Sequence, residues 1–139
     1  LDRSSAASDV YKRQTQNQAK QAALEALGAT VIYLPGHDAR GQPTGKVDLA
    51  AMVKDLGQRE INELHVEAGF KLNGSLLREG LVDEFVIYLA PKLLGQGAGM
   101  FNIGPLTELT QGIALDFKST EMVGPDLRIV ARVQGQDTF

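Results

Sequence analysis

Residues 64–94, LHVEAGFKLNGSLLREGLVDEFVIYLAPKLL, carry the strongest structural pattern in this 139-residue chain. The pattern predicts a short strand over 63–66, a helix over 71–79 and a second strand over 83–90. Three leucines at helical spacing form the apolar side of the helix, and Gly80 follows it as the residue type that most often ends a helix. The segment therefore predicts a strand–helix–strand unit.

The sequence before this segment predicts a second unit of the same kind. It indicates a helix over 15–27, a strand over 30–34 and a loop over 35–45, which contains three glycines and two prolines. A further helix follows, capped by Asp48 and ended by Gly57.

The sequence after it predicts a glycine-rich loop over 95–105 and then a β-hairpin with strands at 115–123 and 127–133. Strands that alternate with helices favour right-handed crossover units with parallel strands. The expected fold class is therefore α/β, with a mixed, mainly parallel sheet, helices on its faces and a C-terminal antiparallel hairpin.

Composition excludes several classes of protein. The chain has no cysteine, so it has no disulfide framework and no cysteine-based metal site. A net charge of −3 argues against a nucleic-acid-binding module, and the longest apolar run, 85–90, is far shorter than the roughly 20 residues of a membrane span. We expect a cytoplasmic protein that partners neither nucleic acid nor membrane. Residues 1–14 lack apolar periodicity and are expected to be a non-native or disordered leader before a domain over 15–139.

The turn between the first strand and the helix of the 64–94 segment is the candidate binding site. Ligands of such sheets gather at the carboxyl ends of parallel strands, where we expect Glu67, Ala68 and Gly69 to lie. Backbone N–H groups at a helix start favour phosphate, and Gly69 and Gly74 permit close approach to the backbone. An ordinary strand-to-helix turn also accounts for the glycines. Glu67 either binds hydroxyl or amino groups of a ligand or caps the helix.

Other motifs in this region are incomplete. The glycine spacing of the turn matches a P-loop, but Ser75 and Leu76 stand where that motif needs Lys and Ser or Thr, so an NTPase site is not expected. His65 and Glu67 match the H-x-E of zinc deaminases, which also requires cysteines that the chain lacks. Because His37 is the one other histidine, we predict no metal site.

Residues 64–94 closely resemble the reductase domain of the bifunctional riboflavin-biosynthesis deaminase/reductase family. The likeness continues through Gly95 and Gln96, returns at 123–127 (VGPDL), and extends over 15–133. The resemblance implies a dihydrofolate-reductase-like three-layer sandwich and a homodimer. It also implies NADPH-dependent reduction of 5-amino-6-(5-phospho-D-ribosylamino)uracil to the ribitylamino product, in which a hydride passes to C1′ of the ribose.

The resemblance assigns roles to residues of the turn but implies no catalytic residue. Glu67 is implied to contact the pyrimidine substrate. Many relatives have Pro-Thr where this chain has Phe70 and Lys71, so one possible phosphate contact is lost while Lys71 adds a positive charge. The segment implied to hold the NADPH phosphates comprises Gly69, Phe70, Lys71, Leu72, Asn73, Gly74 and Ser75.

The family's reductase domain begins with strands and loops that do not precede Thr15, and its deaminase domain is also absent from this chain. We therefore expect 15–139 to be the C-terminal part of a reductase domain, with little or no turnover by itself because part of the positioning machinery is missing. Two alternatives remain. One is a non-catalytic nucleotide-binding or dimerisation module of the same fold, and the other is a related pyrimidine or dihydrofolate-type reductase.

Overall fold

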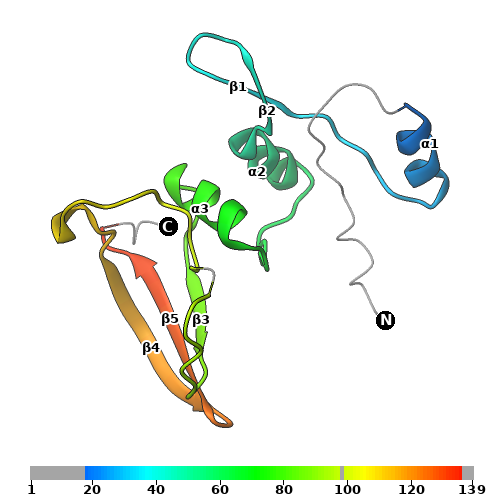
Figure 1. Ribbon diagram of the computed structural model, residues 1–139. Coiled ribbons are helices and arrows are strands. Elements are labelled where there is room, and N and C mark those ends of the chain that lie inside the picture. The colour runs from blue at the N-terminus through cyan, green and yellow to red at the C-terminus, as the bar shows by residue number, and fades with distance from the viewer. Residues whose placement is uncertain (1–17, 98, 136–139) are drawn as a thin grey trace. The chain divides into compact units, whose positions relative to one another are not determined.

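The computed structural model describes residues 18–97 and 99–135 and divides the chain into two compact units, Leu1–His65 and Val66–Phe139 (Figure 1). The two units are described separately below. The leader predicted at 1–14 and the first three residues of the helix predicted over 15–27 lie outside the described residues.

The first unit contains two of the predicted helices, α1 and α2. Asp48 caps α2 as expected, because its carboxylate accepts a hydrogen bond from the Ala51 N–H at 2.8 Å. Leu49 and Leu56 occupy the same side of α2 and are buried. The elements of this unit are α1 (Gln18–Ala26), β1 (Pro35–His37), β2 (Pro43–Val47) and α2 (Leu49–Gln58).

The segment predicted as a loop over 35–45 is instead an antiparallel hairpin of β1 and β2. The carboxylate of Asp38 accepts hydrogen bonds from the backbone N–H groups of Arg40 and Gln42, both at 2.9 Å. The Thr44 hydroxyl donates to the Gly36 carbonyl at 3.1 Å. Glycine and proline mark a turn but do not show whether the chain on either side of it pairs, so this composition does not distinguish a loop from a hairpin.

The two short runs predicted as strands, 30–34 and 63–66, are not strands, which corrects the two predicted crossover units. A strand is held by hydrogen bonds to a neighbouring strand, and neither run has one beside it among the described residues. Composition alone identified segments suited to a sheet, but it carried no information about a partner.

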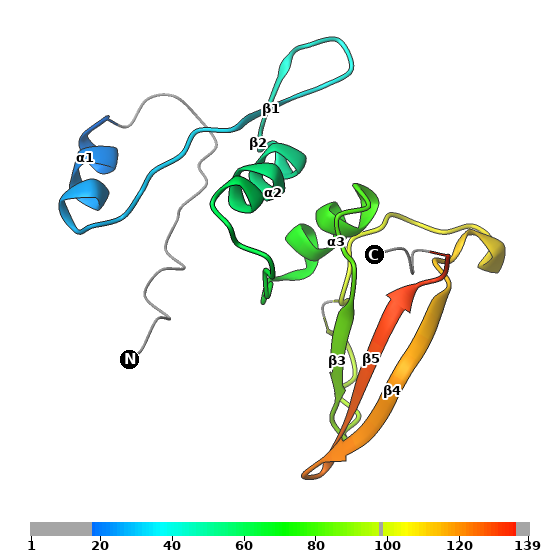
Figure 2. The same cartoon turned by 180° about the vertical axis from the view of Figure 1, so that it is seen from behind.

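Among its described residues, the second unit contains one α-helix, a short 3-10 helix and a three-stranded sheet in the order β3-β5-β4 (Figure 2). The predicted hairpin is confirmed and turns through Gly124, whose φ is 59°. The strand predicted over 83–90 is also confirmed, but it runs antiparallel to β5. The elements of this unit are α3 (Phe70–Arg78), β3 (Phe85–Leu89), η2 (Leu109–Gln111), β4 (Leu115–Val123) and β5 (Asp126–Val133).

The fold is therefore mixed α/β, and the predicted mainly parallel sheet is not what the described strands form. Every strand pair among residues 18–97 and 99–135 is antiparallel. The predicted parallel arrangement depended on strands at 30–34 and 63–66. Because neither segment forms a strand, the parallel arrangement is lost with them. No helix in the described parts of the chain is long and apolar enough to cross a membrane.

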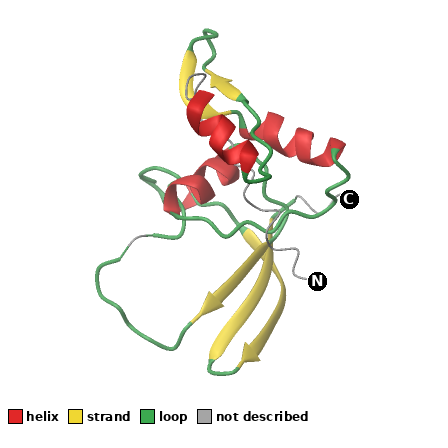
Figure 3. Ribbon diagram, turned by 90° about the vertical axis from the view of Figure 1, so that its right-hand side faces the viewer, coloured by secondary structure: helices red, strands yellow, loops and turns green. Residues whose placement is uncertain are grey.

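Figure 3 shows the three strands of this sheet in yellow, lying side by side. From the strand register, the sheet has one apolar face and one charged face. On the charged face, Arg128 pairs with Glu121 at 2.7 Å and Arg132 pairs with Glu84 at 3.2 Å. The hydrogen bond to Glu121 raises the pKa of the Arg128 guanidinium, which stays charged. From the strand register, the apolar face consists of Phe85, Ile87, Leu89, Leu115, Phe117, Thr120, Met122, Leu127, Ile129, Ala131 and Val133.

The apolar face is covered at one end and exposed at the other. Phe85 and Ala131 are buried, at 8% and 0% exposure. The ring of Phe101, from the glycine-rich loop, meets the Phe85 ring edge to face at 5.4 Å. At the opposite end, in contrast, Leu89 is 59% exposed and Met122 is 65% exposed. Phe117 is also 65% exposed, because it pairs with Ala131 from the edge strand β4. The packed end of the sheet is thus the end from which β3 begins.

Candidate functional site

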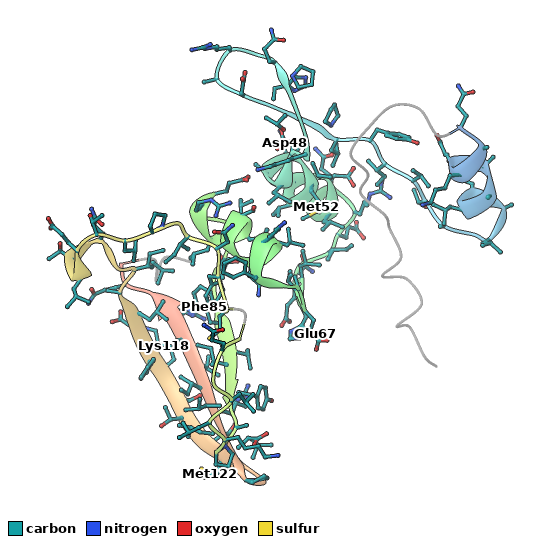
Figure 4. All side chains as sticks on the ribbon, viewed as in Figure 1. Asp48, Met52, Glu67, Phe85, Lys118 and Met122 are labelled. Atoms are coloured by element: carbon teal, nitrogen blue, oxygen red, sulfur yellow. The ribbon has the colours of Figure 1, made fainter. Side chains whose placement is uncertain are left out.

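The candidate site is the turn that leads into α3, within the second unit. Figure 4 shows Glu67 in the segment just before the helix, with its side chain exposed. Gly69 is the N-cap residue of α3, in an extended conformation with φ −88° and ψ 171°, and it has no side chain to cap the helix. The first backbone bond of the helix runs from the Asn73 N–H to the Gly69 carbonyl at 3.1 Å. The N–H groups of the first turn therefore lack an intrahelical acceptor.

The amino-terminal part of the predicted cofactor segment is open. A Cβ at Gly69 would have no atom within 4 Å, so a ligand can approach the backbone there. Phe70, Lys71 and Leu72 are exposed in the first turn of α3. The helix dipole places a partial positive charge at this end of α3, and the Lys71 ammonium adds a full positive charge to it.

The carboxyl-terminal part of the same segment is covered. Asn73 and Ser75 are half-buried, and Gly74 is buried. A Cβ at Gly74 would lie 2.5 Å from the backbone nitrogen of Asn102 and 2.6 Å from its carbonyl carbon. The two glycines of the motif thus differ, since Gly69 leaves space for a ligand and Gly74 admits a neighbouring backbone.

The neighbour is residues 99–102 of the glycine-rich loop, here named the docked segment. The Asn102 N–H donates to the Phe70 carbonyl at 3.0 Å, and Arg78 donates to the Asn102 carbonyl. A Cβ at Gly99 would lie 3.3 Å from the Phe70 ring. The docked segment therefore contacts residues from the first turn, the middle and the last turn of α3.

Sequence reasoning missed the docked segment as part of the site. The glycine-rich loop was predicted, and it is confirmed as irregular chain in its described residues. Nothing in its composition indicated that Asn102 would pack on Gly74, which is 28 positions earlier in the sequence. A glycine inside a helix pattern was the available signal, since such a glycine costs helix stability and often has a packing reason.

No cluster of three or more His, Cys, Asp or Glu side chains that suits a metal ion occurs in the described parts of the chain. The polar groups at the turn are instead the Glu67 carboxylate, the Lys71 ammonium and the backbone N–H groups of the first turn of α3. This set suits a ligand that carries both an anionic group and hydrogen-bond donors.

The model of the RibD C-terminal domain family matches residues 1–129 of this chain. The chain belongs to that family. The riboflavin biosynthesis protein RibD of Escherichia coli K12 is 44% identical over 84 residues, which are 60% of this chain and 23% of the relative. The 5-amino-6-(5-phosphoribosylamino)uracil reductase of Buchnera aphidicola from Acyrthosiphon pisum is 38% identical over 86 residues, which are 61% of this chain and 42% of the relative.

A solved structure agrees with these sequence relatives. RibD of Acinetobacter baumannii, form 2, superposes with a TM-score of 0.64 at 26% identity, over 86% of this chain and 30% of that protein. The resemblance to the riboflavin-pathway reductase domain is thereby confirmed. The chain spans less than half the length of each of these relatives.

Proposed function

We propose that this chain forms part of a reductase of riboflavin biosynthesis that converts 5-amino-6-(5-phospho-D-ribosylamino)uracil to 5-amino-6-(5-phospho-D-ribitylamino)uracil with NADPH. Family membership and the reductase named in Buchnera aphidicola support the proposal. The observation that carries it is the open turn into α3, where an N-cap without a side chain directly follows the segment that holds Glu67.

The turn has the properties that a dinucleotide phosphate requires. The first-turn N–H groups of α3 provide hydrogen-bond donors, and the open surface at Gly69 lets an anion reach them. Lys71, exposed beside them, adds a charge that strengthens such contacts. When bound, NADPH supplies a hydride, which reduces C1′ of the ribose while the ring oxygen takes up a proton and the sugar opens.

Glu67 is proposed to bind the pyrimidine. An ionised carboxylate accepts hydrogen bonds, and the amino and ring N–H groups of an aminouracil are donors. Glu67 is exposed just before the N-cap of α3, which supports a substrate contact next to the proposed phosphate site. Because both ligands must be held together for hydride transfer, the main contribution of these residues is orientation.

The larger assembly is also a matter of proposal. We propose a dihydrofolate-reductase-like three-layer sandwich for the whole domain, supported by the superposition on the Acinetobacter baumannii structure. A cytoplasmic homodimer is proposed as well, and the exposed end of the apolar face supports self-association. Catalysis by the 139-residue chain alone is expected to be weak, since orientation depends on groups beyond this turn.

Calorimetric titration with NADPH and with the ribosylaminouracil substrate tests the proposal. Glu67→Gln is expected to weaken substrate binding about tenfold, the loss of roughly one charge-assisted hydrogen bond, and to leave NADPH binding within about twofold. Glu79→Gln, the same change at the other end of α3, is the control and should alter neither. Equal losses for both ligands would make Glu67 a structural carboxylate, and a wild-type chain that fails to bind NADPH would refute the cofactor site.

A further inference from the structure

Asn73 makes two contacts that α3 itself does not need. Its side-chain amide donates one hydrogen bond to the Ala68 carbonyl at 3.1 Å and another to the Met100 carbonyl at 3.3 Å. Asparagine is a weak helix former, because its side chain competes for backbone groups. The amide has two N–H donors, so both bonds can exist at once. One side chain therefore joins the turn into α3 to the docked segment.

One of the two carbonyl groups lies in the turn into α3 and the other lies in the docked segment. Ala68 stands between Glu67 and Gly69, and Met100 lies in the docked segment beside Phe101. A trans peptide is planar, so fixing the direction of a C=O also fixes the N–H of the next residue, which points the opposite way. Holding the Ala68 carbonyl thus orients the Gly69 N–H, at the proposed phosphate site. Holding the Met100 carbonyl orients the Phe101 N–H in the same manner.

We propose that Asn73 is a positioning residue that holds the turn into α3 and the docked segment as one unit, so that a nucleotide bound at the turn also orders the docked segment. The identity of this ligand rests on the proposed function. The bridge itself rests on the two hydrogen bonds of Asn73. Other contacts, such as the Asn102 N–H to the Phe70 carbonyl, attach the docked segment to the helix, whereas Asn73 attaches it to the turn as well.

Amide hydrogen exchange at Asn102 tests the bridge without any ligand. Asn73→Ala removes both donors while favouring the helix, so a loss of protection cannot arise from a weaker α3. We expect the protection of the Asn102 amide to fall about tenfold, as for the loss of one net hydrogen bond. Asn73→Asp replaces the donor amide with a carboxylate, which cannot donate to the two carbonyl groups. This variant should lower the protection of the Asn102 amide at least as much.

Asn102→Asp is the matched control. It makes the same isosteric change and adds the same charge within the docked segment, but the hydrogen bonds that join Asn102 to α3 use its backbone N–H and carbonyl. In this variant, the protection of the backbone amide at position 102, corrected for the intrinsic exchange rate, should stay within about threefold of wild type. That change is smaller than the roughly tenfold loss expected when one hydrogen bond is removed. Unchanged protection in both Asn73 variants would refute the bridge.

NADPH then tests the coupling. In the wild-type chain, saturating NADPH should raise Asn102 protection, and in Asn73→Ala this rise should be lost while the dissociation constant increases about tenfold. An equal ligand-induced rise and an equal affinity in both proteins would overturn the positioning role. If the wild-type chain binds no NADPH, the proposed cofactor site fails, and the ligand-free exchange still decides whether Asn73 makes the bridge.

Discussion

Substituting alanine for each of two helical glycines should change stability in opposite directions. Gly57 lies in the last turn of α2, where an added Cβ meets no atom within 4 Å. Gly74 lies within α3, where the added Cβ would collide with three backbone atoms of Asn102. Neither glycine has a positive φ, so both backbones accept alanine, and the difference between the variants measures the contact with Asn102.

The size of each effect follows from the same structure. Alanine in place of glycine within a helix favours folding by about 0.5–1 kcal/mol, which is the full effect expected for Gly57→Ala. At Gly74 the docked segment must move away, which costs about 1–3 kcal/mol as overpacking. The movement also weakens the bond from the Asn102 N–H to the Phe70 carbonyl, worth about 1 kcal/mol. Gly74→Ala should therefore destabilise the protein by about 1–3 kcal/mol net.

Urea unfolding followed by circular dichroism at 222 nm measures both variants, and hydrogen exchange at Asn102 shows where Gly74→Ala acts. We expect a higher urea midpoint for Gly57→Ala and a lower one for Gly74→Ala, with Asn102 protection lost in the latter alone. If Gly74→Ala were as stable as Gly57→Ala and kept Asn102 protected, the backbone contact between α3 and the docked segment would be wrong.

Three further changes test other parts of the chain. Lys71→Ala should weaken NADPH binding by about 1–3 kcal/mol in a fluorescence titration, whereas Lys92→Ala should not; an unchanged dissociation constant would remove Lys71 from the site. Asp48→Ala should lower the free energy of unfolding by about 1 kcal/mol through loss of the α2 cap, and an unchanged urea midpoint would contradict that bond. Met122→Lys, on the exposed end of the apolar face, should reduce the mass measured by light scattering at high concentration. Ser119→Lys, on the opposite face, should leave this mass unchanged. Equal masses for Met122→Lys and the wild-type chain would exclude the apolar face as the contact between copies.

The sequence predicted best those elements whose ends are set by nearby residues. Asp48 and the apolar positions that follow it located α2, and Gly80, with a φ of 66°, marked the end of α3 to within two residues. The C-terminal hairpin was also predicted because its two strands are joined by a turn at Gly124. In each case the information lies within about ten residues of the element.

The elements that were predicted incorrectly are strands, and a strand depends on a neighbouring strand that can lie far away in the sequence. The runs at 30–34 and 63–66 have strand composition, but composition cannot supply the neighbouring strand that makes a ladder. The strand at β3 was predicted correctly and its direction was not, because its partner β5 lies about 40 residues later and nothing local sets the orientation of that pair. The type of an element was therefore easier to predict from the sequence than the pairing and direction of the strands in the sheet.

The same limit applies to the candidate site. The turn from Glu67 to Gly69 was identified from a local pattern, a short segment predicted as a strand and followed by a glycine and a helix. The different roles of Gly69 and Gly74 were not predictable, since both match a phosphate-binding spacing and only the approach of Asn102 separates them. Asn73 belongs to the same class, because its second acceptor is 27 residues away. A glycine or an asparagine inside an otherwise regular helix is thus a local sign of a contact whose partner the local sequence cannot name, and here both signs point to the same docked segment.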